Sequence, residues 1–165
     1  SKGPGSYTGL RIGVSAAKGL CYSRDLPLIG VNTLQGMALA VKSKFENKDA
    51  IFIPMIDARR MEVYNAIYDW ELNEIEGTQA TIIDENSFKE YEDKECYFFG
   101  DGMLKCEAVL QHLKKSKFID DINASAKEIG YLAQQKFALG DFENTAYFEP
   151  YYLKEFVTQS VFHKK

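Results

Sequence analysis

A glycine-rich stretch near the start of the chain, GPGSYTGLRIGVSAAKGL at positions 3–20, most constrains the fold. Three glycines within seven residues lead into a helical pattern, so the stretch either cradles a phosphate or begins a closely packed helix. A Walker loop requires GxxxxGK followed by Ser or Thr, and a dinucleotide loop requires GxGxxG. Neither motif is present, because Gly9 precedes Leu10 and Thr8 replaces the third dinucleotide glycine. We expect Ser6 or Thr8 to cap the helix instead.

The helix expected at residues 8–23 has one narrow polar stripe, and its other positions are small or apolar. The stripe consists of Arg11, Ser15, Lys18 and Tyr22. Such a pattern predicts burial on both flanks of the helix. Small residues, Gly9, Gly13 and Ala17, recur every four positions and leave a smooth groove for another helix. That neighbour could belong to this chain or to another subunit, and the sequence leaves both possibilities open.

Alternating helical and strand patterns predict an α/β fold. We expect a short strand at 28–31, a helix at 33–45, a boundary in KSKFENKD at 42–49, and three strands within 50–57, 62–71 and 77–84. Pro54 implies a bulge or an edge position in the first of these three strands. Capping-box spacing at Ser87 and Ser125 predicts two more helices. Between them, CYFFGDG predicts a strand ending in a tight turn, followed by a helix from about Met103, and Gly140 is expected to end the last helix.

Composition excludes several classes of function. The formal net charge is −4 and the basic residues are dispersed, which gives no dedicated nucleic-acid grip. The three cysteines form no CxxC motif, as expected for packed thiols in a reducing compartment. No long apolar run or signal peptide is present, so we expect a cytoplasmic protein without a membrane segment. Because the chain begins at Ser1 inside a loop, we expect an N-terminal portion to be missing.

Three blocks together resemble one known family. GPGSYTGLRIGVSAAKGL, then PLIGVNTL, then IDARRMEVY resemble the TsaB (YeaZ) family, the dimerisation subunit of the bacterial tRNA threonylcarbamoyladenosine machinery, often labelled glycoprotease-like. EPYYLK near the end is similar to the family's closing P-x-Y-L followed by Arg or Lys. The resemblance implies the actin-like ATPase fold of sugar kinases and heat-shock ATPases, with two lobes built on mixed sheets. Residues 1–48 would form the C-terminal part of an incomplete first lobe, and residues 49–165 the second lobe with a C-terminal tail.

The resemblance also implies that this chain performs no catalysis. In the catalytic paralogue, TsaD, two histidines four residues apart bind a metal, whereas Thr33 and Met37 stand at those positions here. His112 and His163 have no partner at ligand spacing. We therefore expect no catalytic residue, metal ligand or cofactor in this chain, with ATP and metal bound by partner subunits.

The phosphate turn of actin-like ATPases, D-x-G, is replaced here by DARR, with Ala58 and Arg59 at the tight positions. Their side chains would block the approach of a phosphate. Asp57, Arg59 and Glu62 could form a polar cluster at the mouth of a cleft, for which we expect an ion pair rather than catalysis. The glycines of FGDGM at positions 99–103 either retain part of a ligand turn or connect a strand to a helix, and we favour the connection.

The function implied is a non-catalytic scaffold that supports threonylcarbamoyl transfer to the adenosine next to the tRNA anticodon. The implied partners are a TsaD-like paralogue and a TsaE-like P-loop ATPase, with tRNA contacted only through the complex and a homodimer when the paralogue is absent. The expected partner-binding residues are Gly9, Leu10, Gly13, Val14, Ala17, Lys18 and Cys21. The alternatives are a metal-dependent glycoprotease-like hydrolase and an ATP-binding chaperone or kinase of the same fold. Metal analysis and nucleotide titration would distinguish these alternatives.

Overall fold

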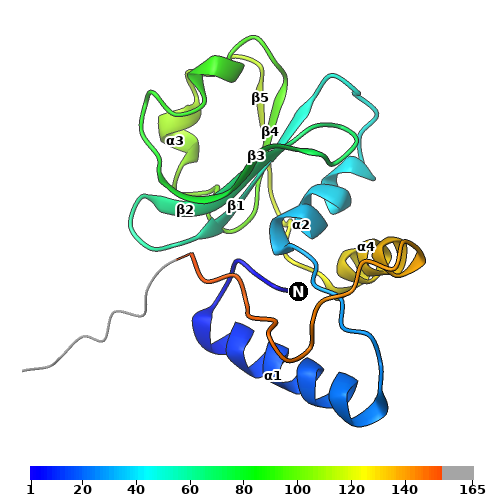
Figure 1. Cartoon of the computed structure of the whole chain (residues 1–165). Coiled ribbons are helices and arrows are strands. Elements are labelled where there is room, and N and C mark those ends of the chain that lie inside the picture. Colours follow the sequence, from blue (N-terminus) through cyan, green and yellow to red (C-terminus); the bar gives the residue numbers. More distant parts are fainter. Residues whose placement is uncertain (154–165) are drawn as a thin grey trace, which may run out of the picture.

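A mixed five-stranded sheet forms the centre of the computed structural model, which describes residues 1–153 of the 165 (Figure 1). The strand order is β3-β2-β1-β4-β5. The strands are β1 (Ile51–Asp57), β2 (Glu62–Tyr68), β3 (Glu74–Ile82), β4 (Cys96–Phe99) and β5 (Ser116–Ile119). The first three form an antiparallel meander, and β4 and β5 extend the sheet in parallel pairing from β1. The predicted α/β class and the predicted meander are both confirmed.

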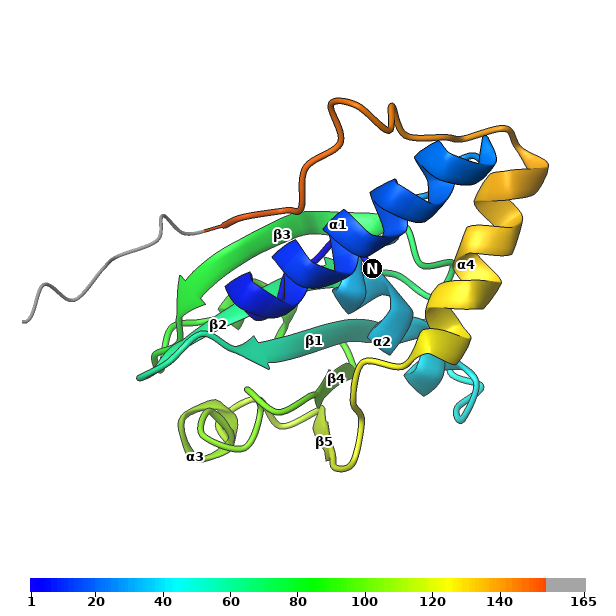
Figure 2. The same cartoon turned by 90° about the horizontal axis from the view of Figure 1, so that it is seen from below.

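Both faces of β1 are buried because alternate side chains enter two separate hydrophobic clusters. Ile53 and Met55 belong to the cluster on the side of α3 (Glu107–Leu110). Phe52 belongs to the cluster on the other side, which includes Leu34 and Met37 of α2 (Thr33–Lys42). Figure 2 shows α2 and α3 on opposite sides of the sheet. This burial on two sides explains why β1 reads as an uninterrupted apolar run.

Helix α2 lies between the sheet and α4 (Ala126–Ala138). The side chain of Asn32 accepts a hydrogen bond from the Leu34 amide at 2.9 Å and begins α2. The two helices approach closely at Gly36, where an added Cβ would lie 2.8 Å from Cδ1 of Ile129. Ser125 caps α4 by accepting from the Lys127 amide at 3.2 Å, which confirms the predicted helix start. Because α2 shares its core with β1, residues on both sides of the boundary expected near 48 form one packed body, and the division into lobes stays a prediction.

Helix α1 (Tyr7–Arg24) stands apart from the sheet and is held by the C-terminal segment 143–153 (Figure 1). The Lys18 ammonium donates to the backbone oxygens of Ala146 at 3.1 Å and Phe148 at 2.8 Å. The Tyr151 amide donates to the backbone oxygen of Lys2 at 2.7 Å. Ser6, one of the two residues predicted as the cap, begins α1 by accepting from the Gly9 amide at 3.3 Å. Within the part of the chain described, Val14 is the one buried residue of α1, so the expected burial on both flanks is wrong for this chain by itself.

Two strand expectations differ from the structure. Residues 28–31 form no ladder: Leu28 makes a single antiparallel bridge to Glu143. Pro54 lies in β1, the middle strand of the sheet, so the expected edge position is wrong. The register to β2 continues unshifted from Phe52–Tyr68 to Met55–Asn65, so the alternative of a bulge is also wrong, and on its other side Pro54 pairs with Phe99 of β4.

Three helical expectations also differ. The helix expected at Ser87 is one 3₁₀ turn (Lys89–Tyr91), because the Ser87 hydroxyl accepts from the Asp84 amide at 3.0 Å instead of capping a helix. The helix expected from Met103 is preceded by turns, and only α3 is α-helical. The short strand β5 was not expected from the sequence, since its four residues follow consecutive lysines and show little alternation.

Gly100→Ala is expected to unfold the chain far more readily than Gly140→Ala. Both glycines have positive φ, +102° and +70°, but a Cβ at Gly100 would collide with the Met55 carbonyl and lie 2.7 Å from Cε of Met37. We expect Gly100→Ala to lower the free energy of unfolding by about 3 kcal/mol or more, through left-handed strain and overpacking together. Gly140→Ala, with open space around it, should cost only about 1 kcal/mol. Urea unfolding of both variants measures the difference, and equal losses would contradict this packing.

Candidate functional site

A cleft of ≈ 830 Å³ lies between the start of α1 and the β1–β2 hairpin, and the end of the described chain forms its third wall. The glycine-rich stretch contributes the residues before and within the first turn of α1. The hairpin contributes the segment IDARR, for which the sequence predicted a cleft mouth. The lining residues are Pro4, Gly5, Ser6, Tyr7, Thr8, Leu10, Ile56, Asp57, Ala58, Arg59, Arg60, Glu62, Tyr64, Asp101, Tyr151, Tyr152 and Leu153.

The predicted polar cluster forms, but its ion pair involves a lysine that the sequence did not indicate. The Lys105 ammonium contacts the Asp57 carboxylate and donates to the backbone oxygen of Glu62 at 2.7 Å. Asp57 also accepts from the Arg59 amide at 2.9 Å. The hydrogen bond from Lys105 holds the pKa of the Asp57 carboxyl below its ordinary value, with smaller contributions from Arg59. Lys105 therefore ties the hairpin to the turn that follows β4.

The hairpin turn places two consecutive arginines in left-handed backbone conformations. The φ angles are +74° at Arg59 and +51° at Arg60. Two successive positive φ angles are typical of tight hairpin turns, where Asn and Gly are the usual residues. An L-residue with a side chain pays roughly 1–2 kcal/mol for this conformation. The tight positions are thus Arg59 and Arg60, and the expectation that Ala58 occupies one of them is wrong.

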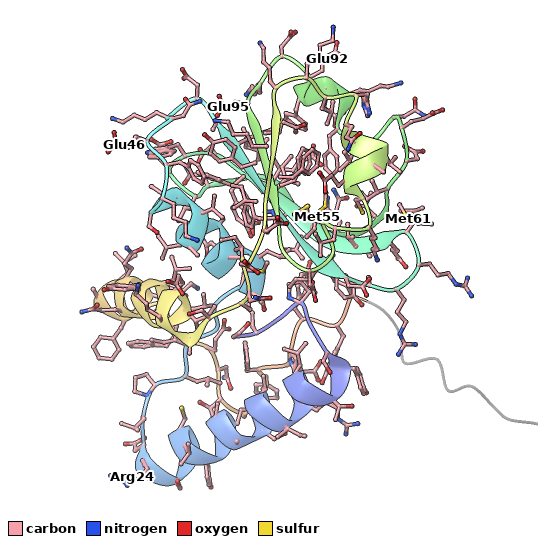
Figure 3. All side chains as sticks on the ribbon, turned by 180° about the vertical axis from the view of Figure 1, so that it is seen from behind. Arg24, Glu46, Met55, Met61, Glu92 and Glu95 are labelled. Carbon is pink, nitrogen blue, oxygen red and sulfur yellow. The ribbon has the colours of Figure 1, made fainter. Side chains whose placement is uncertain are left out.

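The glycines after β4 serve close packing, so the structural interpretation of FGDGM is confirmed. An added Cβ at Gly102 would lie 2.9 Å from the backbone carbon of Ile56, and Gly100 is in contact with Met55. Between them, Oδ1 of Asp101 accepts from the Asp57 amide at 2.9 Å and secures the end of β1. Figure 3 shows Met55 inside the sheet region and Met61 on the β1–β2 hairpin.

The seven expected partner-binding residues lie on two different faces of α1. Five of them face the chain itself and are buried or half-buried. These five are Leu10, Val14, Ala17, Lys18 and Cys21. Gly9 and Gly13 lie on the opposite, exposed face. The polar stripe is divided as well, because Lys18 turns inward to the C-terminal segment while Arg11 remains exposed.

The exposed face of α1 also carries two large apolar side chains that the sequence analysis did not single out. Ile12 is 67% exposed and Leu20 is 65% exposed. At 3.6 residues per turn, they lie on the same side as Gly9, Gly13 and Ala16. We call these five residues the outward face of α1. A search for apolar residues between the small ones, rather than for the polar stripe, would have found them.

The positions that match the paralogue's histidines are occupied inside the fold. Thr33 is buried, and its hydroxyl lies 2.5 Å from the hydroxyl of Ser1. Met37 is buried in the core. No group of three or more His, Cys, Asp or Glu side chains among residues 1–153 is arranged to hold a metal ion. The ring of His112 contacts the backbone oxygen of Val109 at 2.9 Å, and His163 lies outside the described residues.

The cysteines are unpaired, and two of them are core residues. Burial raises the pKa of the Cys96 thiol to about 11 and also raises the pKa of Cys106. Cys21 is half-buried on the inward side of α1, and its thiol donates to the backbone oxygen of Pro27 at 3.7 Å. None of the helices within residues 1–153 is long and apolar enough to span a membrane.

Comparison with known proteins places these features in a family. The family model described as TsaD, tRNA N6-adenosine threonylcarbamoyltransferase, matches residues 1–135. The chain is 32% identical over 144 residues to the tRNA threonylcarbamoyladenosine biosynthesis protein TsaB of Bacillus subtilis. The aligned region covers 82% of this chain and 61% of that protein. It is 44% identical over 84 residues to TsaB of Escherichia coli, and this aligned region covers 49% of this chain and 36% of that protein. The chain thus spans less than two thirds of the length of these relatives.

The fold is shared with a solved structure of the same group. YeaZ from Pseudomonas aeruginosa superposes with a TM-score of 0.70 over 93% of this chain and 72% of its own, at 18% sequence identity. Together with the mixed sheet and its covering helices, this likeness confirms the predicted actin-like ATPase-type fold. The chain belongs to the TsaD family described by that model and, within it, to the TsaB (YeaZ) proteins.

Proposed function

We propose that this chain is a non-catalytic scaffold subunit in the biosynthesis of threonylcarbamoyladenosine in tRNA. It presents α1 to a TsaD-like catalytic paralogue, and a TsaE-like P-loop ATPase joins the assembly as a third component. ATP and metal bind the partner subunits, tRNA is contacted through the complex, and the setting is cytoplasmic. The names of the TsaB relatives support a role in this biosynthesis.

The observation that carries the proposal is the outward face of α1. A Cβ added at Gly13 would meet nothing within 4 Å, and at Gly9 it would make only ordinary contacts with Ser6. Glycine in a helix interior is less favourable than alanine by about 1 kcal/mol. Within this chain, close packing does not require a glycine at position 13. On the same face, the large apolar side chains of Ile12 and Leu20 are exposed to solvent. A helix from a partner that packs closely against this face would account for both features.

The outward face also permits self-association. A two-fold axis brings the same patch of two copies together, so the small and apolar residues of one outward face would pack against those of the other. We therefore propose that the chain forms a homodimer through α1 when the paralogue is absent. The five inward residues of α1, Lys18 included, are buried or half-buried against the chain and position the helix for this contact.

The hydrolase and ATPase alternatives receive less support from the site. Thr33 and Met37 are enclosed by the chain's own packing, so a metal held there would have to displace core side chains. The hairpin turn that would approach a phosphate carries side chains at Arg59 and Arg60, which have positive φ and are exposed. No observation favours either alternative over the scaffold.

Gly13→Leu is expected to weaken binding of the TsaD-like paralogue at least tenfold, which corresponds to about 1.4 kcal/mol. The leucine would keep the two helices from close approach, although this chain itself has room for it. Gly130→Leu on α4 is the matched control, because Gly130 is also an exposed helical glycine with nothing within 4 Å. Isothermal titration calorimetry with the paralogue measures both variants. Equal affinities for the two variants would overturn the assignment of the outward face.

Gly13→Ala is expected to stabilise the isolated chain while it weakens the complex. Removing a helical glycine with no packing role should raise the free energy of unfolding by about 0.5–1 kcal/mol. Thermal unfolding of the isolated chain checks the gain, and Gly130→Ala should give a similar one. A loss of stability on Gly13→Ala would mean that the glycine serves the chain's own packing and would remove the argument for a partner helix.

A further inference from the structure

The arginines of the hairpin turn have a conformation that their residue type disfavours. Arg59 and Arg60 have φ angles of +74° and +51°, a region that glycine occupies without strain. Both residues are exposed, so the packing of the hairpin does not require their side chains. Strain of this kind persists where the side chains have another use.

The two guanidinium groups have no salt bridge or side-chain hydrogen bond within residues 1–153. Three carboxylates, Asp57, Glu62 and Asp101, line the same cleft. Asp57 is paired with Lys105, and Asp101 accepts from the Asp57 amide. Among the described residues, therefore, no salt bridge neutralises either arginine.

The cleft behind the turn is lined with aromatic rings. Tyr7, Tyr64, Tyr151 and Tyr152 come from α1, β2 and the end of the described chain. The rings of Tyr7 and Tyr152 lie 4.9 Å apart, and the Arg11 guanidinium lies over the Tyr7 ring at 5.5 Å. Arg59 and Arg60 are the cationic residues of the cleft lining, whereas Arg11 lies outside it, against the Tyr7 ring. Its volume of ≈ 830 Å³ is within the range of sites that enclose a small ligand or a nucleotide.

We propose that Arg59 and Arg60 bind the phosphodiester backbone of single-stranded RNA, with a base entering the tyrosine-lined cleft. Guanidinium groups pair with phosphate oxygens, and aromatic rings stack on bases without sequence preference. This inference rests on the proposed function, which brings a tRNA to the assembly. The net charge of −4 is consistent with a local contact that contributes to RNA held mainly by partner subunits.

The test measures RNA binding by the complex of this chain with its paralogue. A fluorescent anticodon stem-loop RNA is titrated in an anisotropy assay with wild type, Arg59→Gly/Arg60→Gly, and Arg59→Lys/Arg60→Lys. The control is Arg24→Ala, since Arg24 lies at the far end of α1 from the hairpin that carries Met61 (Figure 3). We expect the glycine variant to bind RNA at least tenfold more weakly and the control to bind as wild type does. The salt slope of log K should decrease by about 1.4 for two lost phosphate contacts.

The glycine variant has a second expected property, which separates loss of binding from loss of structure. Because glycine relieves the left-handed strain, its thermal midpoint should rise even as RNA affinity falls, and the lysine variant should retain most of the affinity. Unchanged RNA affinity in the glycine variant would overturn the inference. The inference would also be overturned if inorganic phosphate or a mononucleotide bound as tightly as the RNA and displaced it.

Calorimetry with the paralogue distinguishes this failure from failure of the proposed function. If the glycine variant loses affinity for the paralogue instead of RNA, the arginines contact a protein and the RNA inference is wrong. If the wild-type chain does not bind the paralogue at all, the proposed function fails independently of the arginines. Normal paralogue binding combined with weakened RNA binding supports both.

Discussion

The close contact between the turn after β4 and the end of β1 determines the geometry of the site. Gly100 and Gly102 bring this turn against Met55 and Ile56, where any side chain would collide. From that position Asp101 accepts the Asp57 amide, and Lys105 reaches the Asp57 carboxylate. The β1–β2 hairpin is thereby fixed at one wall of the cleft, and its strained turn projects toward solvent. The site depends on backbone packing first and on charge second.

Helix α1 is held in a different way, by polar contacts to a segment far along the chain rather than by a core. Only Val14 is buried among the residues of α1, while the Lys18 ammonium fixes the backbone at Ala146 and Phe148. A helix fixed along one side leaves its other side available. In the proposed scaffold the inward side holds the helix in place and the outward side, with its glycines, receives a partner helix.

Local signals predicted much of the fold, whereas contacts between distant residues decided the site. The caps at Ser6 and Ser125, the apolar run of β1 and the meander were predictable because each depends on neighbours in sequence. The faces of α1 were not, because Lys18 appears polar in sequence yet bonds to carbonyls 128 and 130 residues away. The Asp57 ion pair joins residues 48 apart, and no pattern at Lys105 indicates it. The positive φ angle at Arg60 could not be predicted from the sequence either, because the pairing of the flanking strands imposes the turn.

Hydrogen–deuterium exchange of α1 in the free chain and in the complex with the TsaD-like paralogue tests the central claim most directly. The account predicts that amides within Tyr7–Arg24 exchange substantially more slowly in the complex, because a packed partner helix suppresses the opening of a weakly buried helix. The amides of α4 should keep their exchange rates. Unchanged exchange in α1, with protection appearing instead on another element, would contradict the account.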